Sequence, residues 1–249
     1  MVLLACEELF MEERNINAKR FIAAYNRLDQ GLRDIYSIKR TLTFSDMIRK
    51  VANVNTVVSK FEEDLIDYGR LRNAIVHRSG DEIIAEPNTE VVEKLEKVAR
   101  LINTPPKVVD VLKYRKVYSV SGDTKLNDIL LEMGRSGYSV VPVYISGTLV
   151  GVINRKMIVD GLSNIIAQGK DIDDSINGPV ADCLDIFNET SHYEVAPSTI
   201  TIENLLYMFQ QNRKLSSVVL TENGNYTEPA KFVIVSADLI DLNSVLDNY

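Results

Sequence analysis

The same order of predicted elements occurs twice in the second half of this 249-residue chain. In the first copy, the pattern predicts strands at residues 116–120, 139–145 and 149–153, with helices at residues 126–133 and 154–162. In the second copy, it predicts strands at residues 193–195, 216–221 and 232–235, with helices at residues 202–209 and from Asp238 onward. A β-α-β-β-α unit that recurs in this way is an internal repeat, and it predicts two similar modules.

The first hundred residues show a different pattern, which is typical of amphipathic helices. Between residues 17 and 37, apolar side chains recur on one helical face, at Phe21, Ala24, Tyr25, Leu28, Leu32, Ile35 and Tyr36. Thr43 or Ser45 can cap a second helix, which the pattern continues with little interruption to Gly80. A third helix ends before Pro105 and Pro106, because proline cannot continue a helix and favours extended structure in the residue before it.

These patterns predict an α+β protein with three parts, namely an all-helical bundle at residues 1–104 and modules at residues 107–165 and 178–249. Hydrophobic residues make up 45% of the chain and charged residues 25%, which excludes collagen-like and intrinsically disordered proteins. No apolar run approaches the ~20 residues of a membrane span, so we expect no membrane partner. The two cysteines, Cys6 and Cys183, lie far apart and indicate reduced thiols in a cytoplasmic protein.

Acidic residues are concentrated in the second half of the chain. Residues 1–104 hold 16 Lys and Arg against 17 Asp and Glu, whereas residues 105–249 hold 12 against 18. Because nucleic-acid phosphates require a basic surface, we do not expect DNA as a partner, and we expect any RNA substrate at the N-terminal domain. No spacing of His, Cys, Asp or Glu indicates a metal site, and no Gly-rich loop indicates a phosphate-binding loop.

Both modules resemble CBS domains, which pair side by side. In the first module, the resemblance rests on the stretches VSGDT at 120–124, GYSVVPV at 137–143 and GVIN at 151–154. In the second module, it rests on VAPST at 195–199, LSSVV at 215–219 and VIVSAD at 233–238. The resemblance implies that a cleft between the modules binds an adenosine-containing nucleotide as a regulatory ligand, such as AMP, ADP, ATP or a cyclic dinucleotide.

The nucleotide-binding turn of CBS domains carries a Thr and, three residues later, an Asp that binds the ribose hydroxyls. Here the first module has Asn154 and Met157 at these positions, whereas the second has Val235 and keeps Asp238. The resemblance therefore makes Asp238 the best ribose ligand. The other nucleotide-binding residues that it implies are Ser119, Tyr138, Ser139, Val141, Pro142, Asn154, Arg155, Lys156, Val195 and Ser217. The alternative is a purely structural pair, in which Asp238 only supports the start of its helix.

The helical half contains one short motif that suggests a specific function. Residues 70–78 read RLRNAIVHR and place Arg72, Asn73 and His77 at the expected end of a helix, where Asn73 and His77 would share a face. The motif resembles the R-N-x-x-x-H signature of HEPN domains, all-helical modules found in many prokaryotic ribonucleases. The resemblance implies a metal-independent endoribonuclease in which His77 is the general acid/base and Arg72 stabilises the charge on the phosphate. Asn73 would orient His77 or the phosphate. We do not expect His192 to be catalytic.

Two hypotheses follow from these resemblances. In the first, the paired modules sense a nucleotide and control a HEPN-like ribonuclease domain. In the second, the sensor is not an enzyme, and its helical domain serves dimerisation or partner recruitment. Both hypotheses predict a homodimer with an isologous interface. We expect that interface to use apolar helix positions of the modules, namely Ile129, Leu130, Met133, Leu205, Leu206 and Phe209.

Overall fold

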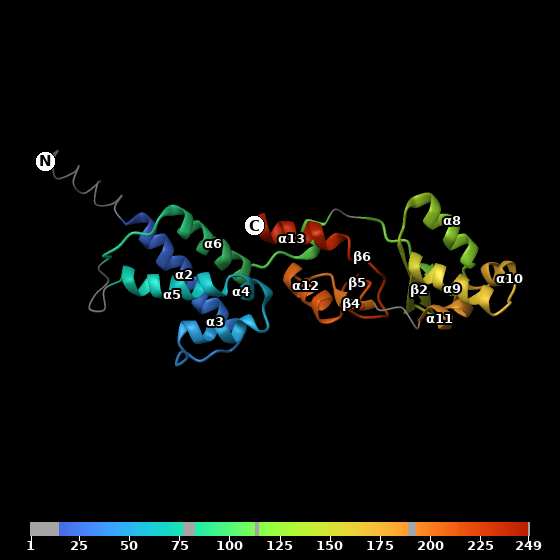
Figure 1. The fold of residues 1–249 in the computed structure, drawn as a ribbon, viewed down its shortest axis with the longest axis horizontal. Helices are drawn as coiled ribbons and strands as arrows, with labels where there is room; N and C mark the ends of the chain where they lie inside the picture. Colours follow the sequence, from blue (N-terminus) through green and yellow to red (C-terminus); the bar gives the residue numbers. More distant parts are fainter. Residues whose placement is uncertain (1–14, 77–82, 113–114, 189–192, 249) are drawn as a thin grey trace. The chain divides into compact units, whose positions relative to one another are not determined.

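The computed structural model describes residues 15–76, 83–112, 115–188 and 193–248. The chain divides into two compact units, residues 1–106 and residues 107–248 (Figure 1). Among the described residues, the first unit is built from helices, whereas the second combines helices with two small sheets. The predicted α+β fold class is therefore confirmed.

The described part of the first unit contains the helices α2 (Ile16–Ile35), α3 (Phe44–Ala52), α4 (Thr56–Lys60), α5 (Glu62–Ile75) and α6 (Thr89–Asn103). Helix α2 packs against α5 and α6 with its predicted apolar face, so that Phe21, Leu28 and Leu32 are fully buried. Ile35 was predicted on the same face but is 55% exposed, because it is the last residue of the helix.

The predicted long helix after Thr43 is wrong, because the chain breaks it into α3, α4 and α5. Thr43 does cap α3, since its hydroxyl oxygen accepts a hydrogen bond from the Asp46 backbone N–H at 3.2 Å. The break comes from a second cap. The buried Asn55 side chain accepts a hydrogen bond from the Val58 backbone N–H at 2.7 Å and starts α4 in a new direction.

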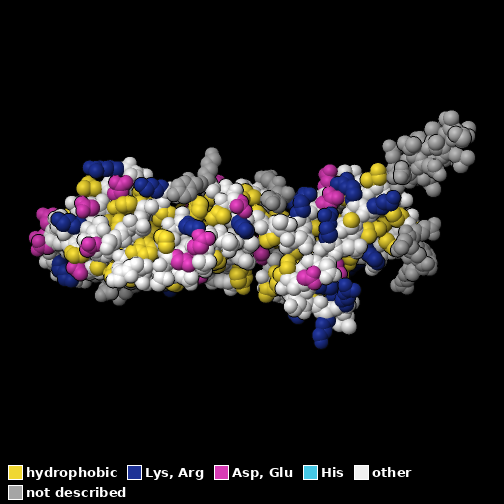
Figure 2. Space-filling view, turned by 180° about the vertical axis from the view of Figure 1, so that it is seen from behind, with side chains coloured by type: hydrophobic (Ala, Val, Ile, Leu, Met, Phe, Trp, Pro, Cys, Tyr) yellow, Lys and Arg dark blue, Asp and Glu magenta, His cyan; other side chains and the backbone are white. Residues whose placement is uncertain are grey.

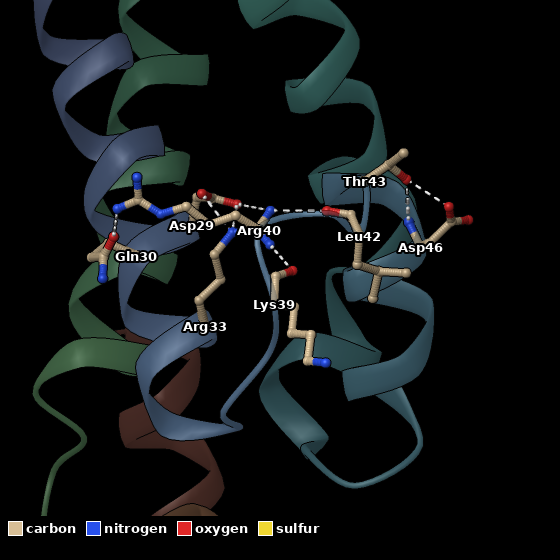
Figure 3. A network of polar contacts seen from close by, with 8 residues as sticks. All are labelled: Asp29, Gln30, Arg33, Lys39, Arg40, Leu42, Thr43 and Asp46. Atoms are coloured by element: carbon tan, nitrogen blue, oxygen red, sulfur yellow. Dashed lines mark hydrogen bonds and ion pairs between the residues drawn. The ribbon is translucent and has the colours of Figure 1, made fainter.

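Arg33 fastens the connection between α2 and α3 to the end of α2 (Figure 3). Its Nε donates to Asp29 Oδ2 at 2.9 Å, and its two Nη atoms donate to the carbonyl oxygens of Lys39 and Leu42 at 2.9 and 3.2 Å. The hydrogen bond that Arg33 donates to the Asp29 carboxylate raises the pKa of Arg33 above its ordinary value. Because the planar guanidinium satisfies several acceptors at once, this irregular segment holds a fixed path.

The second unit contains the predicted repeat. The first module comprises β1 (Val120–Ser121), α8 (Leu126–Ser136), β2 (Val140–Ile145), β3 (Thr148–Asn154) and α9 (Arg155–Ala167). The second comprises β4 (Tyr193–Pro197), α12 (Ile202–Gln211), β5 (Ser217–Thr221), β6 (Phe232–Val235) and α13 (Asp238–Asn248). In each sheet, the first strand is parallel to the second and the second is antiparallel to the third. The strand predicted at residues 116–120 is shorter than expected and begins only at Val120.

Three further helices lie outside the two repeated units, namely α7 (Val108–Val111), α10 (Ile172–Asn177) and α11 (Val180–Asn188). Two of them belong to what we call the leading segments, residues 107–112 and 178–184, which precede the first and second modules. Each leading segment packs on the opposite module. Val108 is fully buried in the core of the second module and donates its N–H to Ile200 O at 3.1 Å. Val180 is fully buried in the core of the first module and donates to Thr124 O at 2.8 Å.

The two sheets also contact each other through a small cluster centred on Leu149, Val152 and Val219. At its edge, Leu149 N–H donates to Tyr226 O at 2.7 Å, and the Tyr144 hydroxyl donates to the Glu228 carbonyl oxygen at 3.0 Å. The shared cluster and the exchanged leading segments explain why the two modules form one compact unit.

The apolar helix positions that we expected in a dimer interface lie inside the modules. Ile129 and Leu205 are fully buried, and Met133 is 4% exposed. Leu206 belongs to the same core as Leu205, while Leu130 and Phe209 are partly buried against their own module's core. The prediction is wrong for the buried positions, because each module needs these side chains in its own core, whereas for Leu130 and Phe209 it stays a prediction.

Candidate ligand-binding cleft

A cleft of about 350 Å³ lies in the second unit. Four parts of the chain line it, namely the segment before β1, the start of β2, strand β6 and the first residue of α13. Its polar and aromatic lining side chains include Arg115, Lys116, Tyr118, Tyr138, Ser139 and Asp238. Because both modules contribute, the cleft exists only when they are paired.

Asp238 is the buried acid of this cleft. It is the first residue of α13 and is 4% exposed. Its Oδ1 accepts a hydrogen bond from Arg115 Nη2 at 2.7 Å, and its Oδ2 accepts one from the Val235 backbone N–H at 3.0 Å. A carboxylate at this end of a helix is favoured by the helix dipole. Asp238 therefore presents hydrogen-bond acceptor atoms to the cleft from a buried position.

Two tyrosine rings add a flat aromatic surface to the cleft. The ring centroids of Tyr118 and Tyr138 lie 5.4 Å apart with an interplanar angle of 24°, so the rings are stacked. Burial raises the pKa of Tyr118 above its ordinary value, which keeps the phenol neutral. A planar heterocycle can stack on such rings with little regard to its hydrogen-bonding edge.

The structure brings some of the predicted nucleotide-binding residues to the cleft and places others elsewhere. Tyr138, Ser139 and Asp238 line it. Ser119 is exposed beside the lining residues but is not among them. Val141 and Pro142 are buried, and Val141 belongs to the core of the first module.

The equivalent turn of the first module is built differently. Asn154 uses its amide oxygen to cap α9, accepting a hydrogen bond from the Met157 backbone N–H at 2.9 Å. Met157, which stands where the second module has Asp238, is 2% exposed and belongs to the first core. The side chain of Arg155 donates to a backbone carbonyl oxygen at 3.4 Å, and Lys156 forms an ion pair within α9.

Two further predicted residues lie outside the cleft lining. Val195 lies at the contact between the sheets, and Ser217 lies in strand β5. Val195 is partly buried against the cluster centred on Leu149. Ser217 is fully buried, and its Oγ has no hydrogen-bond partner. In the first module, Val140 is the strand partner of Asn154, and in the second, Ser217 is the strand partner of Val235. Since Asn154 and Val235 hold equivalent positions, Ser217 is the counterpart of Val140.

Sequence reasoning missed Arg115, Lys116 and Tyr118 as lining residues. A signal was present, because residues 113–116 read KYRK, a basic and aromatic run immediately before the first strand of the repeat. Its meaning depends on Asp238, which lies 123 residues later in the chain.

The structure describes only part of the R-N-x-x-x-H motif of the helical unit. Arg72 has a buried Nε without a hydrogen-bond partner, and its Nη1 donates weakly to Asn73 Oδ1 at 3.4 Å. Helix α5 ends at Ile75, and Val76 is extended with φ −105° and ψ 121°. The prediction that Asn73 and His77 share a helical face involves a residue outside the described ranges and stays a prediction. Gly80, His77, His192 and Cys6 lie outside the described residues.

Within the described ranges, no helix is long and apolar enough to cross a bilayer. The same part of the chain contains no group of His, Cys, Asp and Glu that could hold a metal ion. On the face shown in Figure 2, Lys and Arg side chains lie among Asp and Glu and do not form one continuous basic surface.

A comparison with curated proteins found no match. Among solved structures, 217 chains match. A signal-transduction protein with CBS domains from Burkholderia ambifaria is 15% identical; the match covers 57% of this chain and 95% of that one, with a TM-score of 0.42. CBSX2 in complex with AMP is 17% identical, with coverage of 57% and 98% and a TM-score of 0.41. The CBS domain of a bacterial CNNM/CorC family Mg²⁺ transporter in complex with ATP is 19% identical, with coverage of 60% and 94% and a TM-score of 0.40.

A comparison with family models bears directly on the first module. The model described as CBS domain matches residues 98–164. This stretch begins within α6, contains β1, α8, β2 and β3, and ends within α9. The first of the two repeated modules therefore matches a CBS domain.

Proposed function

We propose that the second unit is a nucleotide-sensing regulatory module pair, and that its cleft binds one adenosine-containing nucleotide. The observation that carries this proposal is Asp238, a carboxylate that is 4% exposed yet lines an open cleft beside two cationic side chains. Each oxygen of this carboxylate accepts one hydrogen bond from the protein and keeps a second lone pair, so the position favours a ligand with hydroxyl donors.

Each part of a nucleotide has a complementary group in the cleft. Asp238 can accept hydrogen bonds from the two ribose hydroxyls. The stacked rings of Tyr118 and Tyr138 offer a face for the base. Arg115 and Lys116 supply positive charge, and the N-terminus of α13 offers backbone N–H groups, for the phosphates. AMP, ADP, ATP and cyclic dinucleotides share these features and are the ligands to test.

The test is isothermal titration of the full chain with these four ligand types. We expect micromolar or tighter binding of at least one of them, at one ligand per chain, because the first module has Met157 where the second has its acid. Asp238→Asn should weaken binding by ~1–3 kcal/mol, the cost of a lost charge-assisted hydrogen bond. Asp241→Asn removes an exposed charge from the same helix and should leave affinity unchanged. Equal affinity of the wild type and Asp238→Asn would contradict this placement of the ribose.

For the helical unit we propose the activity implied by the R-N-x-x-x-H motif, a metal-independent endoribonuclease that acts on RNA as the output of the sensor. The observation that favours it is the buried Nε of Arg72, which has no partner, next to the exposed Asn73. A buried guanidinium N–H without an acceptor is unfavourable, and an RNA phosphate would supply that acceptor. In a homodimer, the motifs of two chains would face each other across one cleft.

The test is cleavage of a fluorescent single-stranded RNA by the full chain in EDTA, with and without the nucleotide found above. His77→Ala should lower the rate ~10²–10⁴-fold, as expected on loss of a general acid/base. Arg72→Ala should likewise lose most of the RNA cleavage activity. Arg70→Ala removes an exposed arginine that pairs with Asp67 and should retain activity. If no RNA is cleaved with or without nucleotide, the helical unit serves dimerisation or recruitment, which light scattering of the same protein then tests.

A further inference from the structure

Each carboxylate oxygen of Asp238 accepts one hydrogen bond from the protein itself. One oxygen accepts the backbone N–H of Val235, which is fixed by the fold. The other oxygen accepts Arg115 Nη2 at 2.7 Å. A ribose hydroxyl that bonds to Oδ1 must share this oxygen with Arg115 or replace it, so the ion pair competes with the ligand at this atom.

The two partners of this ion pair differ in how firmly they are held. The side chain of Asp238 is 4% exposed and lies at the start of a helix, whereas that of Arg115 is 62% exposed. Arg115 lies in the chain before β1, where its long side chain can swing without disturbing a core. Of the two groups, Arg115 is therefore the one that moves.

The charges of the cleft determine what must accompany this movement. Its lining contains the cations Arg115 and Lys116 and one carboxylate, Asp238. When ribose hydroxyls occupy the carboxylate, Arg115 loses its only ion-pair partner among the described residues. A free nucleoside offers no replacement, whereas a phosphate matches the guanidinium with paired hydrogen bonds.

We infer that Arg115 exchanges Asp238 for a ligand phosphate when the nucleotide binds, and that this exchange makes the site selective for phosphorylated nucleosides over free nucleosides. The inference rests on the proposed nucleotide site and assigns Arg115 as its specificity-determining residue. Arg115 therefore acts twice. It pairs with the buried acid Asp238 and, when a nucleotide binds, holds the phosphate.

The test is titration of the full chain with adenosine and with AMP, using wild type, Arg115→Gln and Arg115→Lys. Wild type should prefer AMP strongly. In Arg115→Gln, AMP affinity should fall ~10-fold or more through loss of a charge-assisted bond, while adenosine affinity should stay equal or rise because its competitor is gone. Arg115→Lys keeps the charge and should retain part of the preference. Arg135→Gln removes an exposed arginine from α8, outside the cleft, and should behave as wild type.

The outcomes separate this inference from the proposed function. Adenosine binding that appears only in Arg115→Gln would support the exchange. If Arg115→Gln weakens adenosine and AMP equally, or leaves the preference for AMP unchanged, the exchange is overturned, while sensitivity to Asp238→Asn would keep the nucleotide site. If neither compound nor any other nucleotide tested binds to wild type or Arg115→Gln, both the site and the inference are overturned.

Discussion

The two modules share their strand order, their sheet topology and the exchange of leading segments, yet they differ at the turn after the third strand. In the first module, Asn154 caps its helix and Met157 packs in the core. In the second module, Val235 and Asp238 hold these positions, and the carboxylate faces a cleft. Both turns start a helix, but only one presents a carboxylate to a cleft. The ligand-binding role that we propose thus depends on individual side chains at one turn rather than on the repeated fold.

The strongest test of this comparison gives the first module the acid of the second. Met157 is 2% exposed in a packed core, so Met157→Asp would bury a carboxylate that lacks the Arg115 partner of its counterpart. We expect a loss of ~3–5 kcal/mol in the free energy of unfolding, measured by urea denaturation followed by circular dichroism. Met157→Leu should cost less than ~1.5 kcal/mol. A stable Met157→Asp protein that binds a second nucleotide would show that the two turns are interchangeable.

A smaller effect distinguishes two buried hydroxyls on strand β5. Thr221 and Ser217 are both fully buried, but Thr221 Oγ1 accepts the Gly224 N–H at 3.0 Å, whereas Ser217 Oγ has no partner. Thr221→Val should lower the free energy of unfolding by ~1 kcal/mol, because it leaves the partly buried Gly224 N–H without its acceptor. Ser217→Ala should equal or exceed the wild type in the same urea titration, since it removes an unpaired hydroxyl. A clear loss of stability in Ser217→Ala would reveal a partner for this group.

The smallest expected effect concerns the antiparallel hairpin that the last two strands form in each module. Strands β2 and β3 are joined by a short turn, whereas β5 and β6 are joined by a longer loop that contains Glu228. The backbone N–H of Asn223, together with the side-chain amides of Asn223 and Asn225, holds the pKa of Glu228 down to about 2. Because this pKa is lower in the folded than in the unfolded chain, the loop bonds contribute stability above the unfolded value of about 4.3, and that stability is lost as the pH falls toward 2.

The measurement is the melting temperature of wild type and Glu228→Gln between pH 7 and pH 2. We expect the wild type to melt higher at pH 7 and the two curves to converge at the acidic end. The exposed Asp241→Asn serves as the control for loss of one negative charge. A difference between wild type and Glu228→Gln that does not change with pH would mean that the hydrogen bonds to Glu228 do not depend on its charge.

Sequence reasoning succeeded where a single residue carries its own conformational signal. Gly137 ends α8 at φ 74°, a conformation that favours glycine, Asn154 caps α9, and Thr43 caps the helix that it was expected to cap. It failed where the meaning of a residue depends on a distant partner. Periodicity identified the apolar face of Ile129, but it could not say whether that face covers the module's own sheet or another chain.

The candidate site shows the same limit. Asp238 was predicted from the resemblance of its turn to a known motif. Arg115 has no such motif, and its role appears only when folding brings it next to an acid 123 residues away. Short apolar stretches such as Val108–Val111 likewise carry too little periodicity to indicate which core they enter.

The exchange of leading segments also sets the order in which the modules can be completed during synthesis. When the strands of the first module have left the ribosome, its core still lacks Val180, Cys183 and Leu184, which are made only afterwards. Val108, by contrast, is synthesised early, and its apolar side chain stays uncovered until the second module has been synthesised. Each module therefore exposes apolar surface until the segment that completes its core is available. Translation arrested between residues 165 and 178 would leave an incomplete core that is prone to aggregation.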